Sequence, residues 1–335
     1  MPDKHLGNFV ISLVAIKALL EQYPHEKIAI VFDETYRELA TVNLGSAQLF
    51  FYPYKKLKNF SFIKRCQVFI DFVRSLRHFR PDITIALESS NPEAIMGYLS
   101  GAKRRIAPNT SKSSLLKFLP FLFNEPIALT PHKHRLQGYY DVMAVANLQK
   151  HPNRLPLISP PEQQTIIDQL LLDLGIDIIK PFICMHTGAG KPHKQWATEN
   201  FTQLAEKLVK IGYQVGLIGS RGERDRNNTI LARCPHKLYD LTERVSLGQL
   251  SALFNRCTLM ISNDSGPMHV AAMTGTPVIV LFGPTDDVLW GPLSDKATII
   301  SNKDRKLDSI TVEQVMECLN QDFFSGECFT TKAAI

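Results

Sequence analysis

Apolar and polar residues alternate along the second half of the chain in two rhythms, one typical of buried strands and one typical of helices. Short apolar runs predict strands, and segments with helical spacing separate them. The expected strands are 182–186, 214–218, 237–240, 259–262 and 278–282. The expected helices are 162–175, 200–211, 225–232, 247–254, 267–274 and, after the last of these strands, 312–319. This regular order predicts an α/β domain built on a doubly wound parallel sheet.

The first half carries the same alternation less regularly. Its expected helices are 10–22, 66–79 and 139–148, and its expected strands are 28–32 and 83–87, with a further helix starting at Pro92. The segment 151–161 holds four prolines and little periodicity, which is typical of a linker. We therefore predict two α/β domains, residues 1–155 and 156–335.

One unit of the second domain carries a candidate binding site. The strand 259–262 ends in a cluster of turn and cap residues that includes Asp264, Ser265 and Gly266, and a helix is expected to follow at once. The free N–H groups and the dipole of such a helix start attract phosphate. His269, in the first turns, would add a donor or a positive charge. The same pattern also fits an ordinary βαβ turn, in which His269 is a packed core histidine.

A resemblance makes the binding interpretation more specific. The chain carries Asp264-Ser265-Gly266, then His269 three residues later, and then the run Phe-Gly-Pro-Thr at 282–285. This combination resembles the donor-site signature of glycosyltransferase family 9, the ADP-heptose:lipopolysaccharide heptosyltransferase family. The resemblance implies a GT-B fold, in which two Rossmann-like domains face a cleft. It also implies that the C-terminal domain holds the nucleotide-sugar and that the N-terminal domain binds the acceptor. The tail from Ile310 is expected to pack back onto the first domain.

The loop after the first strand of the second domain is a further candidate for donor binding. Thr187 and Gly188 allow close approach of the backbone to a ligand, and Lys194 stands two residues before Trp196, as in the family's phosphate-binding loop. The alternative for Lys194 is a surface lysine. A Walker A loop does not fit, because Met185 and Pro192 occupy the places of its first glycine and its Ser/Thr.

The turn 219–223 follows the second strand of this domain. In the family, the acidic residue of this turn contacts the nucleotide ribose, and Glu223 occupies that position here. A carboxylate accepting hydrogen bonds from sugar hydroxyls is chemically reasonable. Glu223 is equally suited to cap the next helix, so both interpretations stay open.

The N-terminus departs from the family pattern at the position of the catalytic base. Family members open their first helix with a Gly-Asp pair, whereas this chain has Gly7-Asn8, and the preceding strand is nearly absent. Asn8 can orient an acceptor hydroxyl, but its amide cannot accept the proton. Asp3 and His5 are the nearest titratable residues, and we expect one of them, ahead of Glu88, to act as the base. A start codon placed too late would also explain the missing strand.

Composition sets limits on other functions. The hydrophobic content of 44% and the absence of an uninterrupted apolar run of ~20 residues indicate a globular chain without a membrane span. We see no secretory signal in the first residues, which predicts a cytoplasmic protein. Six scattered cysteines without a C-x-x-C pair predict neither a zinc site nor a disulfide scaffold. No Asp-x-Asp occurs, so we expect no metal and no cofactor besides the co-substrate.

The net charge of +6 is concentrated in two basic runs. The first spans 55–65 and the second spans 103–117, and both lie beside aromatic residues. Such runs suit an anionic bilayer or a phosphorylated lipid, which would make the protein peripheral on the inner membrane face. The alternative is that these two basic runs are an ordinary solvent-exposed surface. We expect no nucleic-acid partner, because no nucleic-acid-binding motif accompanies the charge.

These features together predict an inverting, metal-independent glycosyltransferase. It would move a sugar, a heptose by resemblance, from ADP-heptose to a lipopolysaccharide-core or related saccharide acceptor. The alternative is a catalytically weakened nucleotide-sugar-binding protein of the same fold, which Asn8 favours. A nicotinamide-dependent oxidoreductase is disfavoured, because no G-x-G-x-x-G follows an apolar strand.

Overall fold

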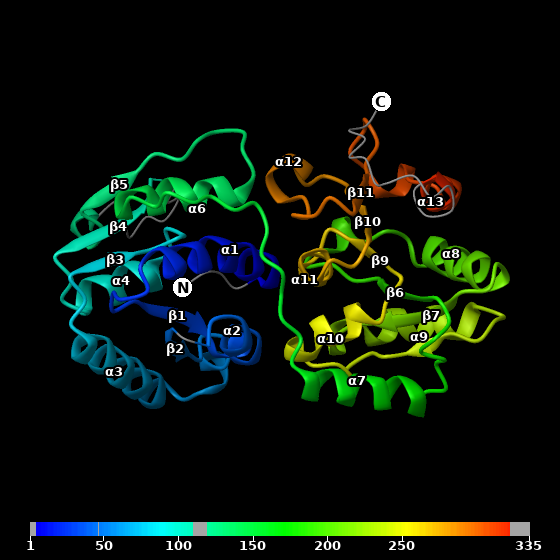
Figure 1. Ribbon diagram of the computed structural model, residues 1–335, viewed down its shortest axis with the longest axis horizontal. Helices are drawn as coiled ribbons and strands as arrows, with labels where there is room; N and C mark the ends of the chain where they lie inside the picture. The colour runs from blue at the N-terminus through cyan, green and yellow to red at the C-terminus, as the bar shows by residue number, and fades with distance from the viewer. Residues whose placement is uncertain (1–4, 46, 110–118, 322–335) are drawn as a thin grey trace. The chain divides into compact units, whose positions relative to one another are not determined.

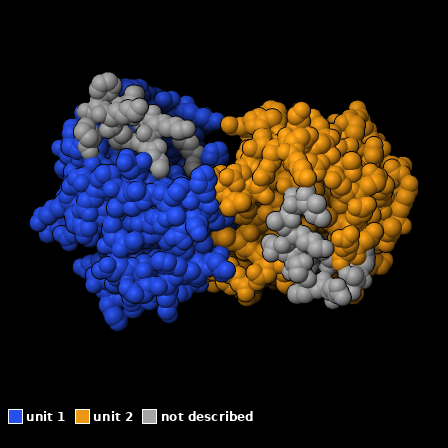
Figure 2. Space-filling view, turned by 90° about the horizontal axis from the view of Figure 1, so that it is seen from above, with its two compact units in different colours: residues 1–153 blue, residues 154–335 orange. Residues whose placement is uncertain are grey.

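The protein is described here by a computed structural model of residues 5–45, 47–109 and 119–321, in which the chain forms two compact units (Figures 1 and 2). Unit 1 ends at Asn153 and unit 2 begins at Arg154. This boundary lies inside the proline-rich segment 151–161. Asp3, the final residues of the tail and the second half of the second basic run, from residue 110 on, lie outside the described residues.

Unit 2 is built on one sheet in which all six strands are parallel. Its strands are β6 (Phe182–His186), β7 (Gln214–Ile218), β8 (Tyr239–Asp240), β9 (Leu259–Asn263), β10 (Val278–Leu281) and β11 (Ala297–Ile300). They lie side by side in the order β8-β7-β6-β9-β10-β11. The chain therefore runs outward from β6 in one direction, returns to β9, and runs outward in the other direction. This is the doubly wound order of a Rossmann fold, and it confirms the prediction.

Helices cover both faces of this sheet (Figure 1). They are α7 (Pro161–Asp173), α8 (Thr198–Lys210), α9 (Arg224–Arg233), α10 (Leu250–Asn255), α11 (Gly266–Thr274), α12 (Asp287–Trp290) and α13 (Val312–Leu319). Alternate residues of the central strands, such as Ile183 and Met185, join one buried cluster with apolar residues of α8, α9 and α13. This division between faces follows from the period of two along a strand.

Some boundaries in unit 2 differ from expectation. β8 starts at Tyr239 instead of residue 237, and the first turn of the helix predicted from residue 247 is a 3₁₀ turn. The sequence analysis missed α12 and β11. Both are four residues long, and a segment of that length carries too few positions for a period to be recognised.

Unit 1 has parallel strands as well, but they form two separate sheets among its described residues. The strands are β1 (Ala29–Asp33), β2 (Gln48–Tyr52), β3 (Ile83–Ile85), β4 (Arg104–Pro108) and β5 (Glu125–Ile127). β1 pairs with β2, and β3-β4-β5 form the other sheet. Its helices are α1 (Leu6–Gln22), α2 (Arg37–Asn43), α3 (Phe62–Phe79), α4 (Asn91–Leu99) and α6 (Arg135–Met143).

The helix α1 is the most buried element of unit 1. Nearly every residue from Gly7 to Leu19 is buried, so the helix is apolar all round instead of amphipathic. It packs against α6. Of the residues before it the structure describes only His5, so the expected near-absence of a leading strand concerns residues outside the described ranges.

Three helices of unit 1 begin earlier than predicted. α1 begins at Leu6 instead of residue 10, α3 at Phe62 instead of residue 66, and α6 at Arg135 instead of residue 139. Caps explain two of these starts, because Ser61 accepts from the Lys64 N–H and His134 from the Leu136 N–H. Caps and not apolar spacing mark these two starts, so an analysis of apolar spacing missed them.

The sequence analysis also missed α2 and three strands of unit 1. β4 contains two arginines, which argue against a central strand, yet Arg104 pairs with Glu125 and Arg105 bonds to backbone carbonyls. β5 contains Pro126 and lies at the edge of its sheet, where a missing N–H is tolerated.

Candidate functional site

The centre of the unit 2 sheet is the point where the winding direction reverses. β6 and β9 are neighbours, while the chain continues from β6 toward β7 and from β9 toward β10. The loops that follow β6 and β9 therefore diverge and leave room between them at the carboxyl edge. Doubly wound sheets bind their ligands at such a switch point. The candidate donor residues 187–194 and 264–269 belong to these two loops and to the start of α11.

Lys194 and Asp264 form an ion pair across this point. Lys194 Nζ lies 2.8 Å from Asp264 Oδ2, and the two side chains are 28% and 11% exposed. The pair fixes the direction of the lysine side chain in a partly buried environment, where a charge-assisted hydrogen bond is strong. The structure thus brings together two residues that the sequence analysis had selected from different loops.

A buried asparagine locks the two loops onto each other. The Asn263 side chain accepts a hydrogen bond from the Trp196 backbone N–H at 3.0 Å and donates to the carbonyls of Thr187 and Gly188 at 2.7 and 3.2 Å. It is fully buried at the end of β9. The sequence analysis took Asn263 as a turn residue only. A buried amide can satisfy three backbone groups at once, and an asparagine at the end of an apolar strand was the signal for this role.

The Thr187 hydroxyl serves the fold. It donates to Asn227 Oδ1 at 2.6 Å, and the Asn227 amide donates in turn to Thr242 Oγ1 and to the Ile218 carbonyl. Thr187 and Asn227 are fully buried, and Thr242 is nearly so. This chain of bonds ties together the loops after β6, β7 and β8. Only the backbone of Thr187 remains suited to approach a ligand.

Glu223 caps its own turn. Its Oε2 accepts from the Ser220 N–H and hydroxyl at 2.7 and 2.6 Å, which completes a capping box. The side chain also lies against Gly188, where an added Cβ would come within 2.4 Å of Glu223 Cγ. Gly188 is therefore needed because Glu223 occupies the space that any larger residue would take.

The helix α11 begins with an unusual N-cap. The Ser265 hydroxyl makes no capping bond; it lies 3.0 Å from His186 Nδ1 and 2.9 Å from Ser262 Oγ. Burial lowers the pKa of His186 from an ordinary 6.5 to about 4, against the opposing influence of the Glu223 carboxylate. His186 is therefore neutral near pH 7, and it orients Ser265 without adding charge. With Ser265 held in this way, the first N–H groups of α11 are not capped by its side chain.

His269 lies further along α11 and is 3% exposed. It follows Gly266 and Pro267 within the first four residues of the helix. The His269 side chain is packed in the interior of unit 2, which agrees with its alternative interpretation as a core histidine.

The candidate base residues of unit 1 lie at the start of α1. Asn8 is the third residue of this helix and is 9% exposed, and His5 is the exposed N-cap residue. Asp3 is outside the described residues. Glu88 forms an ion pair with Arg135 and accepts from the Tyr139 hydroxyl at 3.2 Å. The Glu88 carboxylate is therefore already engaged by two residues of α6.

Two searches of the described residues gave negative results. No three or more His, Cys, Asp or Glu side chains lie close enough together to hold a metal ion. No helix within the described ranges has the length and apolar character needed to cross a membrane.

Comparison with known proteins identifies relatives along most of the chain. Lipooligosaccharide heptosyltransferase 2 of Haemophilus influenzae is 39% identical, but the match spans only 32% of this chain and 33% of that protein. Lipopolysaccharide heptosyltransferase 2 of Escherichia coli K12 is 29% identical over 73% of this chain and 76% of the relative.

Solved structures agree with the fold. The glycosyltransferase family 9 protein of Veillonella parvula superposes with a TM-score of 0.83 at 22% identity, covering 95% of this chain and 94% of the other. The E. coli ADP-heptose lipopolysaccharide heptosyltransferase II superposes with a TM-score of 0.78 at 23% identity, covering 95% and 96%. These likenesses confirm the predicted GT-B fold. The model of glycosyltransferase family 9 (heptosyltransferase) matches residues 71–320, and the chain belongs to this family.

Proposed function

We propose that the protein transfers heptose from ADP-heptose to a saccharide of the lipopolysaccharide core or to a related acceptor. The observation that carries this proposal is the Lys194–Asp264 pair, which spans the switch point of unit 2 beside the uncapped start of α11. The matched family and the relatives named above are heptosyltransferases, and one structural neighbour is named for ADP-heptose. A helix start and an oriented lysine suit the diphosphate of such a donor.

The proposed reaction inverts the anomeric carbon and needs no metal ion. The acceptor oxygen attacks the anomeric carbon while the bond from this carbon to the phosphate oxygen breaks, and ADP leaves. Negative charge then grows on the diphosphate. Lys194 and the N–H groups of residues 265 and 266 would stabilise that charge in place before the reaction starts. Asp264 would hold the lysine in the required direction, and Glu223 would offer its second carboxylate oxygen to the ribose.

The division of roles between the units is part of the proposal. We assign donor binding to unit 2, because its switch point carries the basic and helix-start groups. We assign acceptor binding to unit 1. Nucleotide-sugars are cytoplasmic and the proposed acceptor is lipid-linked, so the reaction would take place at the cytoplasmic face of the inner membrane.

The acceptor hydroxyl needs a base that removes its proton. Asn8 has no basicity, and the Glu88 carboxylate is already engaged by Arg135 and Tyr139. Asp3 and His5 remain as candidates. His5→Gln and Asp3→Asn, made singly, should leave ADP affinity unchanged, and one of them should lower turnover by about 10²–10⁴-fold. If neither does, the second function gains support: a nucleotide-sugar-binding protein whose transfer activity is weakened by Asn8.

Isothermal titration with ADP tests the donor site directly. Lys194→Ala should weaken binding by about 1–3 kcal/mol, the scale of one lost charge-assisted hydrogen bond, which is roughly 5- to 150-fold in Kd. Lys207→Ala is the matched control, because it also removes a lysine–carboxylate pair, with Glu313, at another place in unit 2. It should leave ADP affinity unchanged. Equal affinity of a folded Lys194→Ala protein and the parent would remove Lys194 from the site.

A second readout connects binding with transfer. Release of ADP from ADP-heptose should require a lipopolysaccharide-core acceptor, and a crystal structure with ADP should place its phosphates within hydrogen-bond distance of residues 264–266. Phosphates bound near Gly7 and Asn8 would reverse the roles assigned to the two units.

A further inference from the structure

The start of helix α3 in unit 1 carries large apolar side chains that the fold does not use. Phe62 and Ile63 are each 79% exposed. Every residue from Ser61 to Gln67 is exposed, whereas the buried residues of α3, such as Phe72 and Leu76, belong to its second half. The first two turns of this helix therefore contribute little to the core. Leaving two adjacent large apolar side chains in water is unfavourable, and a surface that retains them indicates contact with something apolar.

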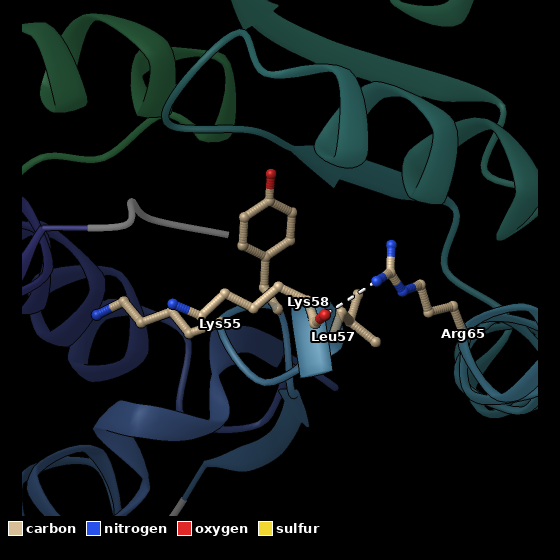
Figure 3. A pocket seen from close by; sticks show the side chains of 5 residues that line it. Lys55, Leu57, Lys58 and Arg65 are labelled. Atoms are coloured by element: carbon tan, nitrogen blue, oxygen red, sulfur yellow. Dashed lines mark hydrogen bonds between the residues drawn. The ribbon is translucent and has the colours of Figure 1, made fainter. Parts of the chain in front are cut away.

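The surroundings of these two side chains are strongly basic. The segment 53–70 contains five lysines and arginines and no aspartate or glutamate. Three of these cations, Lys55, Lys58 and Arg65, line a surface hollow of about 550 Å³ together with Tyr54 and Leu57 (Figure 3). We call the set Lys55, Lys58, Phe62, Ile63, Lys64 and Arg65 the basic–apolar patch.

Two cations of this patch, Arg65 and Lys64, are oriented by carbonyls and by an aromatic ring. Arg65 reaches from α3 to the hollow and donates to the carbonyls of Phe60 and Lys58 at 2.9 and 3.0 Å (Figure 3). Lys64 Nζ lies 4.6 Å from the centre of the Phe60 ring. Such contacts hold a cation in place without neutralising its charge, so the patch keeps a positive potential.

The two carboxylates at the end of β1, Asp33 and Glu34, have hydrogen-bond partners of their own. Asp33 accepts from the backbone N–H groups of Thr35 and Lys55, and Glu34 forms a bidentate pair with Arg37. The positive excess of the patch is thus available to an external anion.

We propose that the basic–apolar patch docks the protein on an anionic phospholipid bilayer. Phe62 and Ile63 enter the boundary between headgroups and acyl chains, and the surrounding lysines and Arg65 contact lipid phosphates. Charge complementarity selects this partner, because an apolar tip ringed by cations matches an apolar layer beneath an anionic surface. The patch is separate from the donor site of unit 2, so docking does not depend on the function proposed above.

Vesicle sedimentation with the full-length protein tests the proposal. The protein should bind vesicles that contain about 30 mol% phosphatidylglycerol and should not bind phosphatidylcholine alone. Raising the salt from about 0.05 M to about 0.5 M should release most of it, because screening shortens the reach of the charges. Binding that is equal for both lipids, or absent for both, would overturn the proposal.

Variants separate the two parts of the patch. Phe62→Ser combined with Ile63→Ser, and Lys58→Gln combined with Lys64→Gln, should each lower the vesicle partition coefficient about tenfold or more. The matched control is Ile178→Ser combined with Ile179→Ser in unit 2. These isoleucines are also adjacent and exposed, at 39% and 91%, but they lie between Asp177 and Lys180, which pair with each other. This control should bind like the parent.

Two further measurements keep the result interpretable. Far-UV circular dichroism and thermal unfolding should match the parent in all these variants, which shows that they fold, and unchanged ADP affinity shows that docking and donor binding are independent. Inorganic phosphate at millimolar concentration should not displace the protein from vesicles. Displacement by phosphate, or parental binding by the Phe62→Ser/Ile63→Ser variant, would show a simple anion site in place of a docking surface.

Discussion

The sheets of the two units differ at the position where a doubly wound fold places its ligand. In unit 2, β6 lies between β7 and β9, so the central strands form a continuous platform and their loops meet at one edge. In unit 1, β1 pairs only with β2 and β3 only with β4 among the described strands. Compared with the strand order of unit 2, the pair β2-β1 corresponds to β8-β7, and the sheet β3-β4-β5 corresponds to β9-β10-β11. No described strand of unit 1 takes the central place that β6 has in unit 2.

This difference shows how a continuous sheet organises a site. In unit 2, the buried amides of Asn263 and Asn227 connect loops from neighbouring strands, so Lys194 and Asp264 meet in a fixed geometry. In unit 1, Glu88 at a strand end is bound by two residues of helix α6 instead. The candidate donor site of unit 2 is thus preorganised by its sheet, whereas Glu88 of unit 1 is held by a helix.

The strongest way to break this comparison is to place a carboxylate at position 8 of unit 1. If neither Asp3 nor His5 acts as the base, Asn8→Asp should raise turnover by about 10²–10⁴-fold, because a carboxylate at this place in α1 could accept the acceptor proton. ADP affinity should not change, since we propose that unit 2 holds the donor. Asn8→Ala is the control, because it alters the same buried position without adding a base. Steady-state ADP release from ADP-heptose measures both, and equal turnover for the Asp and Ala variants would contradict the prediction.

Removing the amide that connects the loops of unit 2 should have the next largest effect. Asn263→Ala leaves the Trp196 N–H and two loop carbonyls without their partner inside the protein, and we expect a loss of about 2–4 kcal/mol in the free energy of unfolding. ADP affinity should fall as well. Both tryptophans of the chain, Trp196 and Trp290, belong to unit 2, so their fluorescence during urea unfolding reports on this unit.

Asn302→Ala provides the matched control for this variant. Asn302 also ties a loop, since it donates to the Ser309 carbonyl and hydroxyl and accepts from Gln314. Its loop is not part of the candidate site. This variant should lose stability while ADP affinity stays at the parental value; a parallel loss of affinity would mean that ADP binding reports only on general stability.

His186 makes the stability of unit 2 depend on pH. Its pKa in the folded protein is about 4, below the ordinary 6.5 of an unfolded chain. Between these values the unfolded chain binds more protons, so stability is complete above pH 6.5 and falls as the pH drops toward 4. The shift corresponds to about 3 kcal/mol at most. His186→Gln keeps a hydrogen-bonding partner for Ser265 and should flatten this part of the profile. Urea unfolding at several pH values, followed by tryptophan fluorescence, checks it.

Most of unit 2 could be predicted because its signals are local. Its short apolar strands end at turn residues, and Lys194 and Asp264 lie in two recognisable motifs. What could not be predicted depends on contacts between distant segments. Asn227 bonds to Thr187, 40 residues away, and Asn263 bonds to Thr187 and Gly188, 76 and 75 residues away, and nothing near either asparagine in the sequence marks these partners.

In unit 1 the misleading signals were local as well. The two arginines of β4 argue against a strand when the sequence is considered alone. In the structure Arg104 pairs with Glu125 of the neighbouring strand β5, so its charge is compensated within the sheet. The starts of α3 and α6 were missed, because caps and not apolar spacing define them. Glu88 was taken as a free group at a strand end, and its partner Arg135 comes from a helix 47 residues later.

The smallest predicted effect tests whether the close packing of unit 2 reaches the donor itself. Gly188→Ala places a Cβ within 2.4 Å of Glu223 Cγ, so the glutamate must move and give up part of its bonding to Ser220. We expect ADP affinity to fall by about 1 kcal/mol, roughly five- to tenfold, because both the backbone approach and the ribose contact are disturbed. Gly190→Ala, two residues later in the same loop, is the control, since an added Cβ meets nothing within 4 Å. It should leave affinity unchanged. The comparison of the two units requires that the sheet fixes the geometry of the loop after β6. If both variants bind ADP like the parent, this loop has room to adjust and that requirement is not met.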